Sequence, residues 1–169
     1  LFGVMRQTRD FIFIYAGVGV GGGLFLNGKL YRGHNGYAGE IGHISTVSEG
    51  TGELCFCGNP GCWETTINQR AVIRRVEACL KNGSSSLIPN LMLEKNESSL
   101  SVELIKQAAD AGDEAALGSF VEVGRAMGQG IAGIVNIFNP EKVVIGGTLS
   151  AASGHLLPAM KAAIAQRAL

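Results

Sequence analysis

Three of the four cysteines in this chain stand close together, in a segment that can form neither a long helix nor a long strand. They are Cys55, Cys57 and Cys62, spaced C-x-C-x4-C, and His43 lies twelve residues before the first of them. Glycines and a proline interrupt this segment, so the thiols lie on tight turns and are free to converge. Structural zinc sites use four tetrahedral sulfur and nitrogen ligands. The pattern predicts a structural zinc held by these four residues.

Two other interpretations of the cysteines remain open at this point. The thiols could be small apolar residues of a glycine-rich loop, because free cysteines are often buried. They could also form one disulfide and leave one thiol over, as in proteins of oxidising compartments. We favour zinc because clustered cysteines on turns seldom serve a core. A reduced, metal-bound cluster in turn favours a cytoplasmic protein.

Two carboxylates bracket this segment, Glu40 in GEIGH and Glu64 in GCWE. Zinc bound by three thiolates and an imidazole is net negative, so neither carboxylate gains by approaching the metal. If His43 binds zinc through one ring nitrogen, its other nitrogen can bond a ligand. Carboxylates and an imidazole make charge-assisted bonds to hydroxyls, which suits a polyhydroxy ligand. Each glutamate alone could equally be a solvated surface residue, so the argument rests on their placement around the cluster.

A glycine-rich stretch, residues 17–23, follows the apolar run 11–15, which suits a strand covered on both faces. The stretch contains G-x-G-x-x-G, but a dinucleotide fingerprint must open a helix there. Apolar residues around Asn27-Gly28 follow instead and predict a hairpin. The loop could bind phosphate through bare backbone N–H groups, or be a turn with no ligand. The candidate phosphate-binding residues are Gly17, Gly19, Gly21 and Gly22.

Helical patterns and one further strand fill the rest of the chain. We expect helices over 65–80, 102–111, 114–138 and from about 154, and a strand over 142–145 that runs into Gly146 and Gly147. Ser101 and Asp113 are the expected N-caps of the second and third helices. The glycines of the longest helix indicate a close backbone approach, which we expect against the sheet. Segment 83–99, rich in Ser and Asn, is expected to be a flexible insert.

Composition limits the possible functions. With 169 residues, one domain with a sizeable core is expected. The formal net charge is zero and no basic run exceeds Arg74-Arg75, so this chain by itself should not bind DNA. The most apolar run, 126–138, is too short to span a bilayer, and no signal peptide is visible. We therefore expect a soluble, cytoplasmic protein without membrane contact.

The motif G-x-x-G-x-A-G-E-x-G-H, followed by C-x-C-G-x-x-G-C-x-E, resembles the signature of the ROK family of repressors, open reading frames and kinases. Weaker similarity runs from about Phe2 to the C-terminus. The resemblance implies an α/β, actin-like ATPase (ribonuclease H-like) fold, of which residues 1–169 form a single C-terminal subdomain with a zinc knuckle, as a fragment of a longer protein. The implied zinc ligands are His43, Cys55, Cys57 and Cys62, and the implied sugar contacts are Glu40, His43 and Glu64.

The resemblance also implies roles for the two glycine groups. Actin-like ATPases wrap phosphates with a strand–loop–strand hairpin, and the family's loop usually carries a threonine where this chain has Val18. That difference puts catalysis in doubt more than fold. The stretch with Gly146 and Gly147 would lie against the adenosine of a nucleotide, although a plain tight turn is an equally good interpretation.

Two functions follow from the resemblance. The first is the sugar-sensing effector domain of a transcriptional repressor, whose DNA-reading domain would precede residue 1; Val18, segment 83–99 and GCWE favour it. The second is an ATP-dependent sugar kinase using ATP and Mg²⁺. In such kinases the catalytic Asp lies upstream of the residue matching Leu1, so we expect no catalytic residue and no kinase activity within these 169 residues. Family relatives also imply a homo-oligomer.

Overall fold

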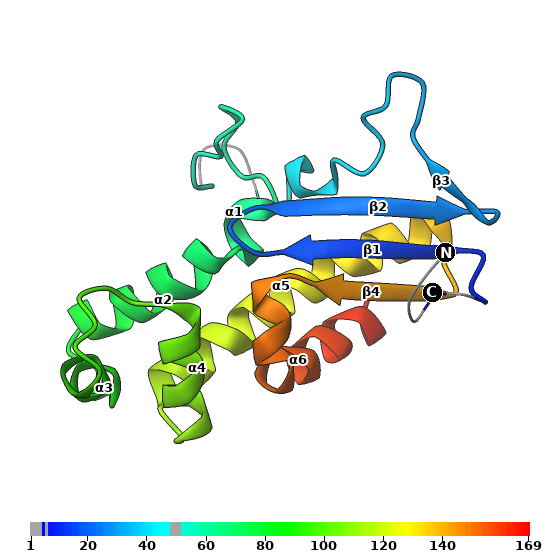
Figure 1. The fold of residues 1–169 in the computed structure, drawn as a ribbon. Coiled ribbons are helices and arrows are strands. Elements are labelled where there is room, and N and C mark those ends of the chain that lie inside the picture. The colour runs from blue at the N-terminus through cyan, green and yellow to red at the C-terminus, as the bar shows by residue number, and fades with distance from the viewer. Residues whose placement is uncertain (1–4, 6, 48–51) are drawn as a thin grey trace.

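The computed structural model describes residues 5, 7–47 and 52–169. The chain has an α/β fold with a four-stranded mixed sheet in the order β3-β2-β1-β4 (Figure 1). The strands are β1 (Phe11–Ala16), β2 (Val20–Leu26), β3 (Lys29–Tyr31) and β4 (Lys142–Gly146). The helices are α1 (Glu64–Ile67), α2 (Gln69–Lys81), α3 (Ile88–Glu94), α4 (Val102–Asp110), α5 (Glu114–Phe138) and α6 (Ser153–Ala165), with short 3-10 helices at Ile41–His43 and Thr148–Ala152.

The glycine-rich stretch forms the expected hairpin. β1 pairs antiparallel with β2, and β2 pairs antiparallel with β3 across Asn27 and Gly28, which both have positive φ. β4 then adds to the other side of β1 in parallel. The expectation that β1 is covered on both faces is wrong for the described residues. Ile12 is buried in the core that β1 shares with α5, whereas Phe13 and Tyr15 on the opposite face are 39% and 45% exposed.

The long helix α5 was expected over residues 114–138 and is present there, but Gly124, Gly128 and Gly130 do not pack against the sheet. A Cβ on Gly124 would collide with the carbonyl oxygen of Leu156, and one on Gly128 with that of Met160. Both carbonyls belong to α6, so the two helices touch through their backbones. Gly130 lies against the indole of Trp63 instead. The close approach is therefore real, but its partners are α6 and the segment before α1.

The two predicted N-caps are confirmed. The Ser101 side chain accepts a hydrogen bond from the Leu104 N–H, and Asp113 accepts one from the Ala116 N–H. The helix expected over 65–80 is instead divided into α1 and α2. It breaks at Asn68, whose backbone is extended and whose side chain caps α2. An Asx cap satisfies helix N–H groups that would otherwise lack partners.

Segment 83–99 contains α3, a helix that the sequence did not indicate. Ile88 in this helix is fully buried in the shared core, and the carboxylate of Asp113 accepts a hydrogen bond from the Leu87 N–H at 2.6 Å. Ile88, Leu91 and Met92 therefore pack on this domain, whereas Leu87 and Leu93 are exposed. Its flexibility stays a prediction.

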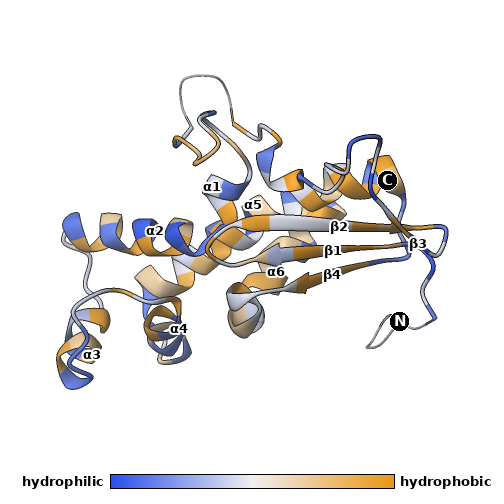
Figure 2. Cartoon of the chain, turned by 45° about the horizontal axis from the view of Figure 1, so that its top comes forward, coloured by the Kyte–Doolittle hydropathy of each residue, from blue (hydrophilic) through white to orange (hydrophobic). Residues whose placement is uncertain are grey.

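Hydropathy follows the layers of the fold. Figure 2 shows β1 and β4 coloured as hydrophobic along most of their length, while α2 alternates between hydrophilic and hydrophobic residues. That alternation is typical of a helix with one face on a core. In the part of the chain that the structure describes, no helix combines the length and the apolar character needed to cross a bilayer.

Candidate metal and sugar site

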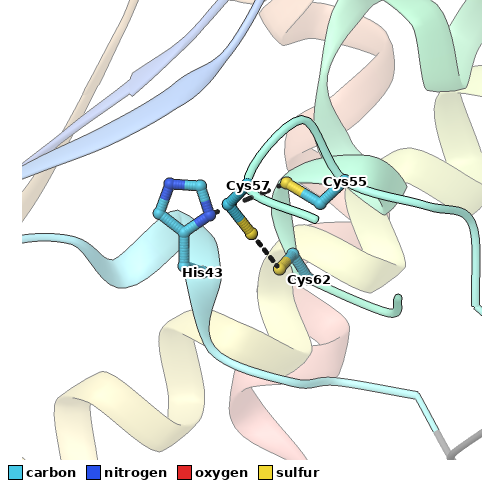
Figure 3. Close-up of side chains that lie close together, drawn as sticks. All are labelled: His43, Cys55, Cys57 and Cys62. Carbon is cyan, nitrogen blue, oxygen red and sulfur yellow. Dashed lines mark hydrogen bonds between the residues drawn. The ribbon is translucent and has the colours of Figure 1, made fainter. Parts of the chain in front are cut away.

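The three clustered cysteines and His43 converge on one point, as Figure 3 shows. His43 ends the 3-10 helix after β3, and the cysteines lie on a turn in front of α1. We call this region, residues 41–47 and 52–63, the cluster loop. The four candidate ligand atoms lie within 4.8 Å of one another. The Sγ atoms of Cys57 and Cys62 are 3.6 Å apart and unbonded, and Cys55 Sγ is 3.7 Å from His43 Nδ1.

Local backbone bonds bring the thiols into place. The Cys55 N–H donates to the Asn59 carbonyl, and the Gly58 N–H donates back to the Cys55 carbonyl, each at 2.9 Å. Gly58 and Gly61 have φ of 92° and 77°, values that residues with a side chain rarely adopt. The glycines therefore close the tight turn that folds Cys62 back beside Cys57.

The thiols differ in how readily they ionise. Burial, strengthened by the neighbouring Cys57 and Cys55, raises the pKa of the Cys62 thiol to about 12. Burial also raises the pKa of the Cys55 thiol, whereas a backbone hydrogen bond from Asn59 lowers the pKa of the Cys57 thiol to about 7. Two of the thiols thus keep their protons at neutral pH unless a cation replaces them, as a divalent metal does.

The geometry fits zinc. Zn–S bonds of about 2.3 Å and Zn–N bonds of about 2.0 Å, arranged as a tetrahedron, place ligand atoms roughly 3.5–3.8 Å apart. The two separations quoted above, 3.6 Å and 3.7 Å, lie in that range. A disulfide between the same cysteines would need their sulfurs at about 2.05 Å. All the pairwise separations lie within 4.8 Å, so small side-chain shifts would bring the four donors into a tetrahedron around a metal ion.

Of the three predicted sugar contacts, two lie together. Glu40 Oε2 is 3.8 Å from His43 Nε2, the ring nitrogen that faces away from Cys55. His43 can therefore offer Nδ1 to a metal and Nε2 to Glu40 or a ligand, which would fix its tautomer. The Glu40 side chain is exposed and available to a ligand's hydroxyls.

The third predicted sugar contact, Glu64, reaches in two directions. Its Oε2 accepts a hydrogen bond from the Val20 N–H at 2.8 Å, and its Oε1 accepts one from the Cys55 thiol at 3.5 Å. One carboxylate thus links the cluster to the start of β2. Gly19 lies directly beside it, since an added Cβ would be 3.0 Å from Oε2. The sequence predicted Glu64 as a ligand contact but not this link to the glycine loop.

Four of the six predicted glycines lie at one end of the sheet, where β1 and β4 end. Gly17 and Gly19 form the turn after β1, and Gly146 pairs with Tyr15 at the end of β4. Gly147 has a φ of 91° and touches the Ala16 carbonyl so closely that a side chain would not fit.

Gly21 and Gly22 instead lie inside β2, paired with β1. An added Cβ on Gly22 would be 2.7 Å from the Gly39 carbonyl, so this glycine is needed for packing.

Sequence reasoning missed two features of this region. Trp63 is buried, and its indole N–H donates to the Ala126 carbonyl of α5 at 2.9 Å. A lone tryptophan in a glycine-rich, polar segment was the available signal. The second feature is an open, mainly apolar cavity of about 640 Å³ with Glu40 on its rim. Its lining includes Leu24, Tyr31, Tyr37, Ile44, Gly133 and Ile137.

These observations define an α/β protein with a mixed sheet and a three-cysteine, one-histidine cluster able to hold a metal ion. The chain belongs to the ROK family, whose sequence profile matches residues 1–169. It is 39% identical over 168 residues to the DNA-binding transcriptional dual regulator NagC of Escherichia coli K12, a match that covers 99% of this chain and 39% of that protein. The chain thus spans about two fifths of the length of this curated relative.

Solved structures of two kinds resemble the fold. A ROK family transcriptional regulator, described as a homologue of the E. coli MLC protein, has a TM-score of 0.84 and 33% identity over 97% of this chain and 39% of its own. A ROK family glucokinase from Streptomyces griseus, solved with glucose and AMPPNP, has a TM-score of 0.85 and 32% identity over 98% of this chain and 53% of its own. Overall similarity therefore does not separate a regulator from a kinase.

Proposed function

We propose that this chain is the sugar-sensing effector part of a ROK-family transcriptional repressor and that it holds one structural zinc. The observation that carries the choice of a regulator is the state of the glycine loop. The Gly17 N–H is bonded to the Gly19 carbonyl, and the Val20 N–H is bonded to the Glu64 carboxylate. A phosphate-binding loop needs such N–H groups free and aimed at the anion. In this loop the Gly17 and Val20 N–H groups are instead bonded within the chain, the second of them to a carboxylate.

The side chain at the turn supports the same conclusion. Val18 is 80% exposed at the tip between β1 and β2, where the family's loop usually carries a threonine. A valine there offers no hydroxyl to a phosphate oxygen. Phosphoryl transfer depends almost wholly on positioning and on neutralising charge, so the loss of a donor beside a carboxylate weakens a kinase more than a receptor.

The sugar would contact the groups around the cluster. Glu40 and His43 are paired and exposed. They precede the cysteines in the sequence, and Glu64 follows them. Carboxylates and an imidazole are strong partners for hydroxyl groups. The zinc would not touch the sugar, because four protein ligands fill its tetrahedral shell. The role of the zinc would be to fix the position of His43 relative to the turn before Glu64.

The fold relation also shapes the proposal. The glucokinase similarity supports an actin-like ATPase arrangement, in which the two glycine groups at the sheet edge would face a nucleotide. DNA binding would need a part of the protein other than these residues, since the chain carries no net charge. Self-association, as a homo-oligomer, belongs to the same proposal.

A sugar kinase is the second candidate, favoured by the glucokinase complex with glucose and AMPPNP. The two candidates separate in one experiment on the protein expressed from the complete gene. We would measure ADP release with ATP, Mg²⁺ and a panel of hexoses and pentoses, and gel retardation of the DNA upstream of the gene with the same sugars. We expect DNA binding that one sugar changes, and no turnover. Sugar-dependent turnover without DNA binding would overturn the repressor assignment.

A variant pair would test the sugar contact. If Glu64 contacts the sugar and Val18 does not, Val18→Thr should leave sugar-dependent DNA binding unchanged, while Glu64→Gln should weaken the sugar response. A Glu64→Gln protein with the wild-type sugar response would remove Glu64 from the proposed sugar site.

A further inference from the structure

Trp63 stands between two residues of the proposed site. Cys62 before it belongs to the cluster, and Glu64 after it bonds the glycine loop. The Trp63 backbone N–H donates to the Ile44 carbonyl at 2.8 Å, directly after His43. Trp63 is therefore hydrogen-bonded through its backbone to the residue that follows His43. It is also the direct chain neighbour of Cys62 and Glu64.

The side chain of Trp63 is seated on α5. It is only 1% exposed, and its indole N–H donates to the Ala126 carbonyl at 2.9 Å. In a helix that carbonyl is the acceptor for the N–H four residues later, which belongs to Gly130. Gly130 is also where the ring lies, so close that no Cβ would fit. One glycine and one carbonyl thus form a fitted seat for the indole.

The seat itself is rigidly held. Gly124 and Gly128, on the same helix, bring α5 into backbone contact with α6. Protein interiors are close-packed, so a shift of α5 needs a shift of α6 with it. The cluster loop, by contrast, has little regular secondary structure of its own. The buried Trp63 indole anchors this loop to α5.

We propose that Trp63 is the positioning residue of the site: by locking its indole to Ala126 and Gly130, it sets Cys62 and Glu64 relative to α5. The inference rests on the proposed metal and sugar site and adds a structural reason for its geometry. Groups that orient metal ligands from behind typically change metal affinity about 10–100-fold when they are removed. Because Trp63 is the chain's one tryptophan, its emission also reports on this position.

The first test uses Trp63→Phe, which keeps an aromatic ring in the seat and removes the N–H donor. Phe120→Leu is the matched control, since Phe120 is buried in α5 against His155, away from the cluster. Zinc affinity is measured by competition with a chromogenic chelator, and stability by urea unfolding of the zinc-loaded proteins. We expect about 10–100-fold weaker zinc binding in Trp63→Phe and an unchanged affinity in Phe120→Leu. Equal affinities in Trp63→Phe and wild type, or an equal loss in the control, would overturn the inference.

The second test needs no variant and remains decisive if Trp63→Phe does not fold. Zinc is removed from the wild-type protein with a strong chelator and restored, while tryptophan emission is recorded. We expect a shift to longer wavelength on removal and its reversal on restoration, because the indole leaves a dry seat for water. Unchanged emission on complete zinc removal would show that the indole and the cluster are not coupled. A wild-type protein that binds no zinc at all would sink the proposed site as well, and zinc analysis distinguishes that outcome.

Discussion

The cluster loop and the α5–α6 pair hold their shapes by different means. In the helix pair, backbone hydrogen bonds are satisfied within each helix, and glycines let the two backbones touch. In the cluster loop, hydrophobic side chains such as Leu54 and Phe56 are exposed, Trp63 alone of its large side chains is fully buried, and four side chains of types that can bind a metal converge. The first region needs only its own packing. We propose that the second depends on a bound metal ion, which the polypeptide alone does not supply.

The largest expected effect is the removal of zinc, which should separate the two regions. Apparent binding energies of such sites are about 10–16 kcal/mol, as large as the roughly 5–15 kcal/mol that stabilises a whole domain. We expect chelation to expose the amides of Cys55 and Trp63 to rapid hydrogen exchange, while interior amides of α5 stay protected. Native-state hydrogen exchange with mass spectrometry measures both.

A cysteine pair provides the control. Cys62→Ser should abolish stoichiometric zinc, whereas Cys79→Ser should retain it, because Cys79 lies on α2 outside the cluster. Protection of the loop amides that survives complete metal removal would mean that the loop is held by packing after all.

The next effect concerns the helix pair. Gly128→Ala would place a methyl group against the Met160 carbonyl oxygen of α6. Overpacking a tight contact costs about 1–3 kcal/mol, more than the roughly 1 kcal/mol that alanine gains over glycine in a helix. Urea unfolding of the zinc-loaded protein should show a net destabilisation with zinc content unchanged. A stabilised Gly128→Ala would mean that the two helices are not in backbone contact.

A smaller effect is expected where the helical region is capped. Burial raises the pKa of the Asp113 carboxyl, but hydrogen bonds from the Ala116 and Leu87 N–H groups outweigh it and hold the pKa below its ordinary value of 3.8. The stabilisation from this carboxylate is therefore present above pH 3.8 and is lost as the pH falls through the lower folded-state value. Asp113→Ala should lose about 0.5–2 kcal/mol at pH 7.

The pH dependence of the stability distinguishes the effect of the negative charge of Asp113 from the effect of its capping hydrogen bond. The stability difference between wild type and Asp113→Ala should shrink in acid, and zinc release at low pH affects both proteins alike. Asp113→Asn keeps a capping acceptor and should lie between them at pH 7. A difference that stays constant down to pH 2 would contradict an ionised cap.

The same contrast explains what could be predicted from the sequence. The hairpin at Asn27-Gly28, the caps at Ser101 and Asp113 and the bounds of α5 follow from local signals, and the structure confirms them. The convergence of the cysteines with His43 follows from residue chemistry and turn-forming glycines, and the structure brings those side chains together. The assigned ligand roles stay predictions.

What the sequence could not reveal depends on partners distant in the chain. No local sequence signal indicates that Gly128 faces α6 rather than the sheet, or that the Trp63 indole bonds the Ala126 carbonyl. The link from Glu64 to Val20 spans 44 positions, and no periodic pattern encodes it. The break at Asn68 was readable in principle, since asparagine is a common N-cap, but an apolar stripe running through it concealed the end of α1.

The smallest expected effect is that of Gly133→Ala, which should stabilise the protein, whereas Gly128→Ala should destabilise it. An added Cβ on Gly133, five residues along the same helix, meets no atom within 4 Å. Gly133→Ala should therefore stabilise the protein by about 0.4–1 kcal/mol, through the lower entropy of the unfolded chain and the better helix propensity. Gly118→Ala is the matched variant, because Gly118 also meets nothing but does not line the cavity beside Glu40. Urea unfolding of both should give similar gains. If Gly128→Ala and Gly133→Ala changed stability alike, backbone contact would not be what distinguishes the helix pair, and its contrast with the cluster loop would fail.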